Sequence, residues 1–258
     1  MEWIDQYFLL FLLLFCRAAS FFLLSPVFSQ RQVPLQAKVG LSAALSLVVT
    51  PIVPAEAELT VGFAYIFLVM KEVLVGLILG FAASLLFLAV QMAGTYIDLQ
   101  IGFAMANLID PQTGAQMPLV ANLKYTFAFL FFLALDGHHQ LINAWLASAE
   151  VVPVASFPQL PFADVTHWFV LFFQKLVLLS VQIAAPMFGA IFLMDLALGI
   201  IARTVPQMNI FVVGFPVKIL GGLLFLLLVL PGFFAFLVIL FREVLASLNE
   251  LIAWMGMR

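Results

Sequence analysis

Charged residues are scarce in this chain: Asp, Glu, Lys and Arg make up 9% of its 258 residues, while hydrophobic residues make up 66%. Soluble domains carry roughly a quarter charged residues, so this composition excludes an ordinary water-soluble protein. The ~10-residue alternating segments of a membrane β-barrel are missing, whereas several apolar runs approach or exceed the ~20 residues that cross a ~30 Å hydrocarbon layer as a helix. The sequence therefore predicts an all-α, polytopic helical membrane protein.

Cysteine and basic clusters are also scarce, and each absence excludes a class of site. Cys16 is the single cysteine, so it can form no internal disulfide and has no partner for a metal cage. The net charge is -3 and the basic residues are scattered, which argues against a nucleic-acid partner. The N-terminus carries Glu2 and Asp5 in place of the basic start of a signal peptide, so we expect the apolar stretch from Tyr7 to be a retained first span.

Motifs for catalysis are missing as well. The sequence has no serine nucleophile elbow, no phosphate-binding glycine loop and no paired intramembrane aspartate motif, so we expect no enzymatic activity, no catalytic residues and no cofactor. The LDGHHQ stretch does offer metal-type ligands in Asp136, His138 and His139. However, adjacent histidines point about 100° apart on a helix, His167 is the one histidine left elsewhere, and HExxH spacing is absent. We interpret LDGHHQ as a polar helix connection and expect no metal.

Apolar runs between polar punctuation indicate about six long helices arranged in hairpins. The runs cover residues 7–28, 39–54, 70–93, 124–149, 168–202 and 219–241. The second run is short and ends at prolines, so it is either re-entrant or covered by neighbouring helices. The fifth spans about 35 residues, roughly 50 Å of helix, which overshoots a bilayer and favours a helix inside a protein assembly.

Lysine and arginine in short loops indicate the orientation. Arg31 and Lys38 mark the first loop, and Arg203 and Lys218 mark the last, so we expect both loops to face the cytoplasm. Two other loops contain no lysine or arginine and should face the opposite side. With six spans, this pattern predicts both termini on the outside.

The longest polar interruption lies between the third and fourth runs, from about Gly94 to Lys124. Pro111, Gly114 and Pro118 punctuate it, and these residues favour a break in the helix. We expect this break between roughly Ile109 and Pro118, and the interruption is the most informative feature of the chain.

Six charged residues lie within the apolar segments: Arg17, Lys71, Glu72, Lys175, Asp195 and Lys218. An isolated charge at mid-bilayer costs about 2.5 to 3.5 kcal/mol on insertion scales, so these side chains should face protein or water. We interpret them as snorkelling residues or interhelical pairs, with an ion or proton relay as the alternative. Gly76 and Gly80 form a GxxxG step that favours a close contact between two helices, in a hairpin or between subunits.

Three segments resemble one known family. The first is FCRAASFFLLSPVFSQRQVPLQAKVGLSAALSLVVTP, an arginine-bearing apolar helix followed by a basic turn and a second apolar helix. The next is GFAMANLIDPQTGAQMPLV, which is similar to that family's loop between its middle helices, and the last is NIFVVGFPVKILGGLLFL, which is similar to its late signature around a GFPVK turn. Together they resemble, over nearly the whole chain, the FliR family of flagellar type III export gates and its SctT-like virulence-secretion relatives.

The final third, APMFGAIFLMDLALGIIARTVPQMNIFVVGFPVKIL followed by LPGFFAFL, also resembles the small two-helix subunit of that gate. The resemblance thus implies one membrane domain, with a four-helix part over 1–160, a central loop near 106–118 and a two-helix hairpin over 161–258. It implies a pseudo-helical hetero-oligomer with one copy of this chain beside subunits of the FliP, FliQ and FlhB families. The assembly would lie in the bacterial inner membrane at the flagellar basal body, in part above the bilayer on the periplasmic side. Subunit packing or ion pairing is expected from Arg17, Lys71, Glu72, Gly76, Gly80, Asp195, Arg203, Pro216 and Lys218.

The implied function is a pore, built with sister subunits, that admits unfolded flagellar substrates and is plugged by the central loop. Irregular backbone is tolerated at membrane depth only where protein or water surrounds it, and methionines adapt around a passing chain. The expected plug residues are Met105, Ala106, Asn107, Asp110, Pro111, Gln112, Thr113, Gly114, Gln116, Met117 and Pro118. The alternative is a secondary transporter for a small solute, with a midplane site lined by Lys71, Glu72, Lys175 and Asp195. A purely structural scaffold is a third interpretation.

Overall fold

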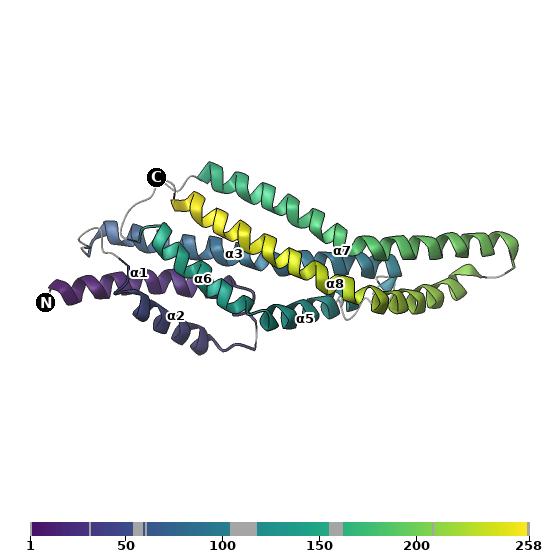
Figure 1. The fold of residues 1–258 in the computed structure, drawn as a ribbon, viewed down its shortest axis with the longest axis horizontal. Coiled ribbons are helices and arrows are strands. Elements are labelled where there is room, and N and C mark those ends of the chain that lie inside the picture. Colours follow the sequence, from purple (N-terminus) through teal and green to yellow (C-terminus); the bar gives the residue numbers. More distant parts are fainter. Residues whose placement is uncertain are drawn as a thin grey trace. The chain divides into compact units, whose positions relative to one another are not determined.

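The computed structural model describes residues 2–30, 32–53, 59, 61–103, 118–154, 162–207 and 209–256. Across these ranges the chain is helical, and Figure 1 shows how the helices follow one another. The helices are α1 (Glu2–Leu24), α2 (Leu35–Val49), α3 (Phe63–Ile101), α5 (Leu119–Ala134), α6 (Gly137–Val151), α7 (Phe162–Thr204) and α8 (Ile210–Gly256). The predicted all-α fold is confirmed.

Within the described ranges, four helices are long and apolar enough to cross a membrane: α1, α3, α7 and α8. A fifth span is added if α5 and α6, which are bent by 69° at their junction, act as one broken span. The described helices thus account for four or five of the about six predicted spans. The second predicted run forms α2, whose 15 residues fall short of the ~20 that a crossing helix needs. The fourth predicted run is interrupted near its middle.

Three helices are much longer than a bilayer requires. α3 has 39 residues, α7 has 43 and α8 has 47. At ~1.5 Å per residue they measure roughly 58 to 70 Å, about twice the ~30 Å hydrocarbon layer. The predicted ends of two runs are wrong, because α3 continues past Gly94 to Ile101 and α8 continues past Arg242 to Gly256. Hydropathy falls in these extensions, but most of their residues remain compatible with a helix.

The chain divides into two compact units, each assembled from separate stretches of sequence. Unit 1 comprises Met1–Leu86, Phe132–Phe173 and Arg242–Arg258, and unit 2 comprises Phe87–Phe131 and Gln174–Phe241. In unit 1, α1 packs against α2 and α6. The long helices therefore contribute one part to each unit.

Small residues on α3 bring it into direct contact with α1 inside unit 1. A Cβ atom added at Gly80 would lie 2.6 Å from the carbonyl oxygen of Phe21. A Cβ atom added at Gly76 would collide with Ser20 Oγ and the carbonyl oxygen of Arg17. The GxxxG step thus forms a close contact between two helices of the same chain.

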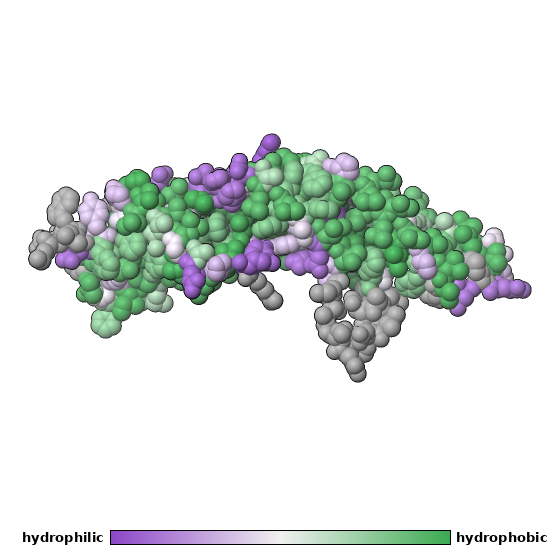
Figure 2. All heavy atoms as spheres, turned by 90° about the horizontal axis from the view of Figure 1, so that it is seen from below, coloured by the Kyte–Doolittle hydropathy of each residue, from purple (hydrophilic) through white to green (hydrophobic). Residues whose placement is uncertain are grey.

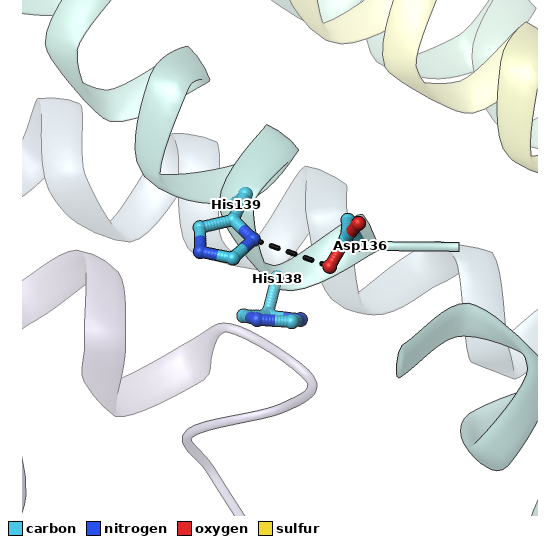
Figure 3. Close-up of side chains that lie close together, drawn as sticks. All are labelled: Asp136, His138 and His139. Atoms are coloured by element: carbon cyan, nitrogen blue, oxygen red, sulfur yellow. Dashed lines mark ion pairs between the residues drawn. The ribbon is translucent and has the colours of Figure 1, made fainter. Parts of the chain in front are cut away.

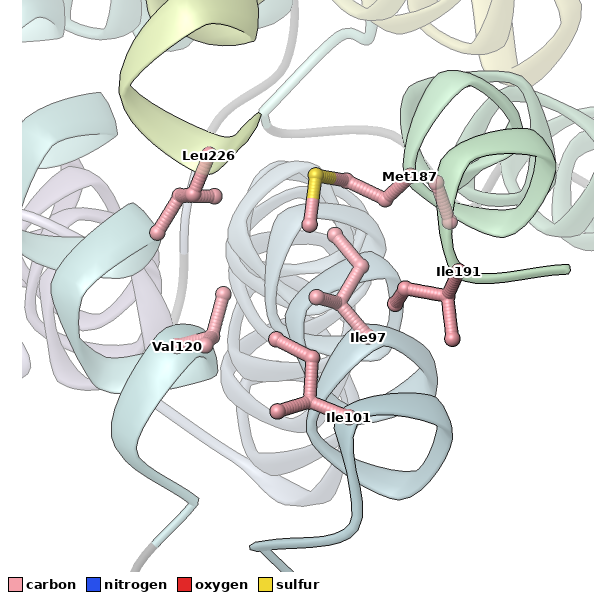
Figure 4. Packing of buried hydrophobic residues seen from close by; sticks show 7 residues of the cluster. Ile97, Ile101, Val120, Met187, Ile191 and Leu226 are labelled. Carbon is pink, nitrogen blue, oxygen red and sulfur yellow. The ribbon is translucent and has the colours of Figure 1, made fainter. Parts of the chain in front are cut away.

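The core of unit 2 joins the end of α3 to the start of α5 and to the α7–α8 hairpin. Aliphatic side chains from all four helices are buried together there (Figure 4). They are Ile97, Ile101, Val120, Ala184, Met187, Ile191 and Leu226. This cluster fixes the two helix ends that flank the predicted central loop.

Large apolar side chains remain uncovered on the hairpin of unit 2. Leu193 and Ile200 on α7, and Leu220, Leu224 and Leu228 on α8, each expose 65% or more of their surface. Figure 2 shows hydrophobic residues over most of the face that it displays. Exposed apolar surface of this extent requires lipid or another protein chain to cover it.

The glycine contact yields a stability prediction. We expect Gly76→Ala to destabilise the protein by about 1–3 kcal/mol, since the added methyl group meets the backbone of α1 and cannot be accommodated without a shift. Gly40→Ala is the matched control, because no atom lies within 4 Å of its added Cβ. Thermal unfolding of the detergent-purified chain, followed by tryptophan fluorescence, measures both. Equal midpoints for the two variants would contradict the tight α1–α3 contact.

Candidate functional site

The first charged site lies in unit 1, around the guanidinium of Arg17. This residue projects from α1 and is 0% exposed. Its Nε donates to the carboxylate of Glu72, which is also fully buried. Its Nη1 donates to the carbonyl oxygen of Ser148 at 2.6 Å, and its Nη2 donates to that of Val152 at 3.0 Å. A cation therefore satisfies the last carbonyls of α6, where the helix dipole favours positive charge.

Lys71 extends the same site. Its Nζ lies 2.7 Å from Glu72 Oε1 and donates to the carbonyl oxygens of Pro153 at 2.7 Å and Val154 at 2.9 Å. Two cations thus share one buried carboxylate, and each cation also donates to backbone carbonyls. Such pairing is what makes buried charge tolerable, because an unpaired buried ion costs several kcal/mol. The site ties α1, α3 and the end of α6 together.

The other predicted charged and packing residues lie in unit 2. Lys218 Nζ lies 2.9 Å from Asp195 Oδ1, so this partly exposed pair joins α8 to α7. Lys175 is exposed on α7, and Arg203 is exposed in its last turn. Pro216 is exposed inside α8. The GFPVK segment is therefore helical and does not form the expected turn, because α8 already begins at Ile210.

A second buried charged site, which the sequence analysis missed, lies at Asp98 in unit 2. The side chain projects from the last turn of α3 and is 4% exposed. Its Oδ1 accepts a hydrogen bond from the backbone N–H of Val120 at 2.9 Å, and its Oδ2 accepts one from Ala121 at 3.0 Å. The carboxylate therefore caps the N-terminus of α5 from a different helix, where negative charge is favoured.

The end of α3 is fixed at the same place. Gly102 has φ of +101°, a conformation that suits glycine and ends the helix, and its N–H donates to the Asp98 carbonyl oxygen at 3.1 Å. Gly94 lies directly on the backbone of Ala121, leaving no room for a side chain. Asp98 thus binds both the residue that follows α3 and the first turn of α5.

The predicted plug residues fall almost entirely outside the described residues. Positions 104–117 are not described, and they include every predicted plug residue except Pro118. Pro118 is half-buried directly before α5, and its carbonyl oxygen accepts the N–H of Asn122 at 3.1 Å. The structure therefore defines the flanks of this segment: Gly102 and Phe103 on one side, and Pro118 on the other.

A buried lysine follows the same segment. Lys124 on α5 is 1% exposed, and its Nζ lies 4.5 Å from the ring centroid of Phe233 on α8, a cation–π contact. Asp98 carried a usable signal in the sequence, since a carboxylate near a helix C-terminus opposes the helix dipole unless it binds elsewhere. Lys124 was read only as the end of a polar interruption, because its packing partner comes from a distant part of the chain.

Comparisons with known proteins converge on one family. A family model described as bacterial export proteins, family 1, matches residues 8–244. The chain is 38% identical over 247 residues to the flagellar biosynthetic protein FliR of Bacillus subtilis, with 95% of each chain covered. It is 30% identical over 255 residues to FliR of Escherichia coli, with 98% of this chain and 95% of that one covered. It is 32% identical over 213 residues to the Yop proteins translocation protein T of Yersinia pestis, with 81% of each chain covered.

The Arg17 site leads to a prediction about buried charge. We expect Glu72→Gln to cost about 3–5 kcal/mol of stability, because it leaves Arg17 and Lys71 buried without their counter-ion. Asp195→Asn is the control, since its partly exposed pair with Lys218 should contribute less than about 1 kcal/mol. Denaturant or thermal unfolding in one detergent compares the two variants. Similar losses would show that Glu72 is not the counter-ion on which unit 1 depends.

The Asp98 site leads to a local prediction. Asp98→Ala removes the acceptor of two backbone N–H groups at the start of α5, and loss of a cap costs about 0.5–2 kcal/mol. We expect faster amide hydrogen exchange in a peptide covering residues 118–125, with a smaller effect for Asp98→Asn, which keeps one acceptor oxygen. Exchange in α2 serves as the internal control. Unchanged exchange at residues 120 and 121 would rule out the cap.

Proposed function

Because the chain belongs to bacterial export proteins family 1, the family of the FliR proteins, we propose that it is a structural, non-enzymatic subunit of a type III export gate. In this role it forms, with sister subunits, the pore that admits unfolded flagellar substrates. The uncovered apolar surface of α7 and α8 supports assembly with further chains as well as with lipid. The expected partners are subunits of the FliP, FliQ and FlhB families around one copy of this chain.

The long helices support a placement that is only partly within the bilayer. α3, α7 and α8 are each roughly twice as long as the ~30 Å hydrocarbon layer is thick. We therefore place the gate in the inner membrane at the flagellar basal body, with part of these helices above the bilayer on the periplasmic side. Among the described residues, the part over 1–160 contains five helices, α1, α2, α3, α5 and α6, where four were expected. This part and the hairpin over 161–258 supply two kinds of packing surface to the same assembly.

A pore of this kind needs a seal. An open channel wide enough for a polypeptide also passes ions, and each elementary charge that crosses 100 mV exchanges about 2.3 kcal/mol. We assign the seal to the segment around Asp110–Gly114. The observation that carries this assignment is Asp98, which holds Gly102 through its carbonyl oxygen and the first turn of α5 through its carboxylate. Because Asp98 holds both flanks of this segment, we expect that the segment can be shortened without moving α3 or α5.

The transporter alternative is weaker because three of its four predicted ligands are already engaged in ion pairs. Glu72 is bound by Arg17 and Lys71, and all three side chains are buried. Asp195 is paired with Lys218. Purification separates the alternatives: a transporter should be isolated alone or as a small homo-oligomer, whereas a gate subunit should appear as a minor component of a heteromer. Mass spectrometry of co-purifying chains identifies which is present.

The seal gives a prediction in cells. We expect deletion of residues 110–114 to leave assembly intact, since Asp98 still holds both flanking helices, and to let ions and small dyes cross the membrane. Cells should then grow poorly on raised sodium or potassium. The leak should disappear when the sister subunits are absent, because it needs the assembled pore.

The matched control is a five-residue deletion of 156–160, between α6 and α7, which should cause no leak. Complex recovery is measured for both deletions. A fully assembled complex that lacks residues 110–114 and conducts no more than the unaltered complex would refute the seal, while leaving the family assignment in place.

A further inference from the structure

The connection between α5 and α6 brings three metal-type ligands together within unit 1. Asp136 has φ of 55°, in the left-handed region, and it precedes α6, which begins at Gly137. His139 Nδ1 lies 3.4 Å from Asp136 Oδ1, and the rings of His138 and His139 have centroids 4.2 Å apart (Figure 3). The left-handed residue turns the Asp136 carboxylate towards the first turn of α6, where the two imidazoles lie.

The distances suit a small transition-metal ion. One ligand atom from each of the three residues lies within 4.8 Å of the others. In a tetrahedral zinc site with bonds of ~2.0–2.1 Å, ligand atoms are about 3.4 Å apart. The Asp136–His139 pair already has this separation, and a ligand atom of His138 lies within 4.8 Å of both. Helical spacing does not separate these three ligands, because Asp136 precedes α6 and the rings of His138 and His139 lie close together.

The hydrogen bonding of His138 is a second, independent observation. Its Nδ1 is buried from solvent and has no hydrogen-bond partner in the structure. A buried polar atom without a partner is costly, and a role as a metal ligand accounts for such an atom. The side chains of Asp136 and His139 are 75% and 65% exposed, so the rest of this chain does not enclose them.

We propose that Asp136, His138 and His139 bind one divalent transition-metal ion of the zinc type, with water completing its coordination. Two imidazoles and one carboxylate favour zinc, cobalt, nickel or copper over magnesium or calcium, which prefer oxygen ligands throughout. The ion links the residue before α6 to the first turn of α6. It therefore stabilises the bend between α5 and α6 and has no catalytic task.

The test uses the full-length chain in detergent, purified with a tag free of histidine and dialysed against chelator. Titration with Co²⁺ should produce the visible d–d bands of a low-coordinate nitrogen and oxygen site, saturating at one ion per chain. The thiolate charge-transfer band should be absent, which excludes Cys16 as a ligand. Zn²⁺ should displace the bands and raise the thermal unfolding midpoint.

Asp136→Asn and His139→Gln should each weaken Co²⁺ binding at least about tenfold, because loss of even an outer-shell partner commonly costs ten- to a hundredfold. Both positions are exposed, so the fold should survive, which the unfolding midpoint without metal verifies. His167→Gln is the matched control and should bind like the unaltered chain. Absence of a stoichiometric Co²⁺ spectrum, or equal binding by the Asp136, His139 and His167 variants, would overturn the proposal.

Discussion

The pairing of one buried guanidinium organises the packing of unit 1. Arg17 cannot lose its charge and presents donors in a fixed plane, so its neighbours must supply acceptors in matching positions. Glu72 and the carbonyls at the end of α6 do so, while Lys71 uses the adjacent carbonyls of Pro153 and Val154. Since these contacts join three helices, the close approach of α3 to α1 at Gly76 and the position of the end of α6 depend on the same site.

In unit 2, too, a buried charge binds backbone groups at a helix end, but here the charge is negative. The carboxylate of Asp98 satisfies two N–H groups that α5 cannot satisfy internally. An apolar chain offers few other acceptors at a helix end, so one acidic residue determines where α5 begins. Both units thus use a small number of buried charges to fix helix termini, while apolar contacts such as those of Ile97 and Met187 fill the space between.

Much of the helical content could be predicted from the sequence, because a long apolar run cannot fold as part of an ordinary water-soluble protein. The runs that became α1 and α7 are close to the predicted ranges. The errors have physical causes. α3 and α8 continue where mean hydropathy falls, because their last turns still bury apolar side chains such as Ile101 and Leu251 among more polar residues. The fourth run breaks at Asp136, where a left-handed residue interrupts it. The polar LDGHHQ stretch indicates this connection, whereas the apolar residues on either side read as one continuous run.

The sequence by itself determined the membrane class, the family resemblance and the set of charges that must be paired, because composition and motifs are local properties. Only the tertiary structure decided the pairs: Arg17 with Glu72 and Lys218 with Asp195. It also decided that Asp98 caps α5 and that Gly76 meets α1. The partners come from stretches of chain far apart in sequence, and their meeting depends on how long helices pack, which a one-dimensional pattern of hydropathy does not encode.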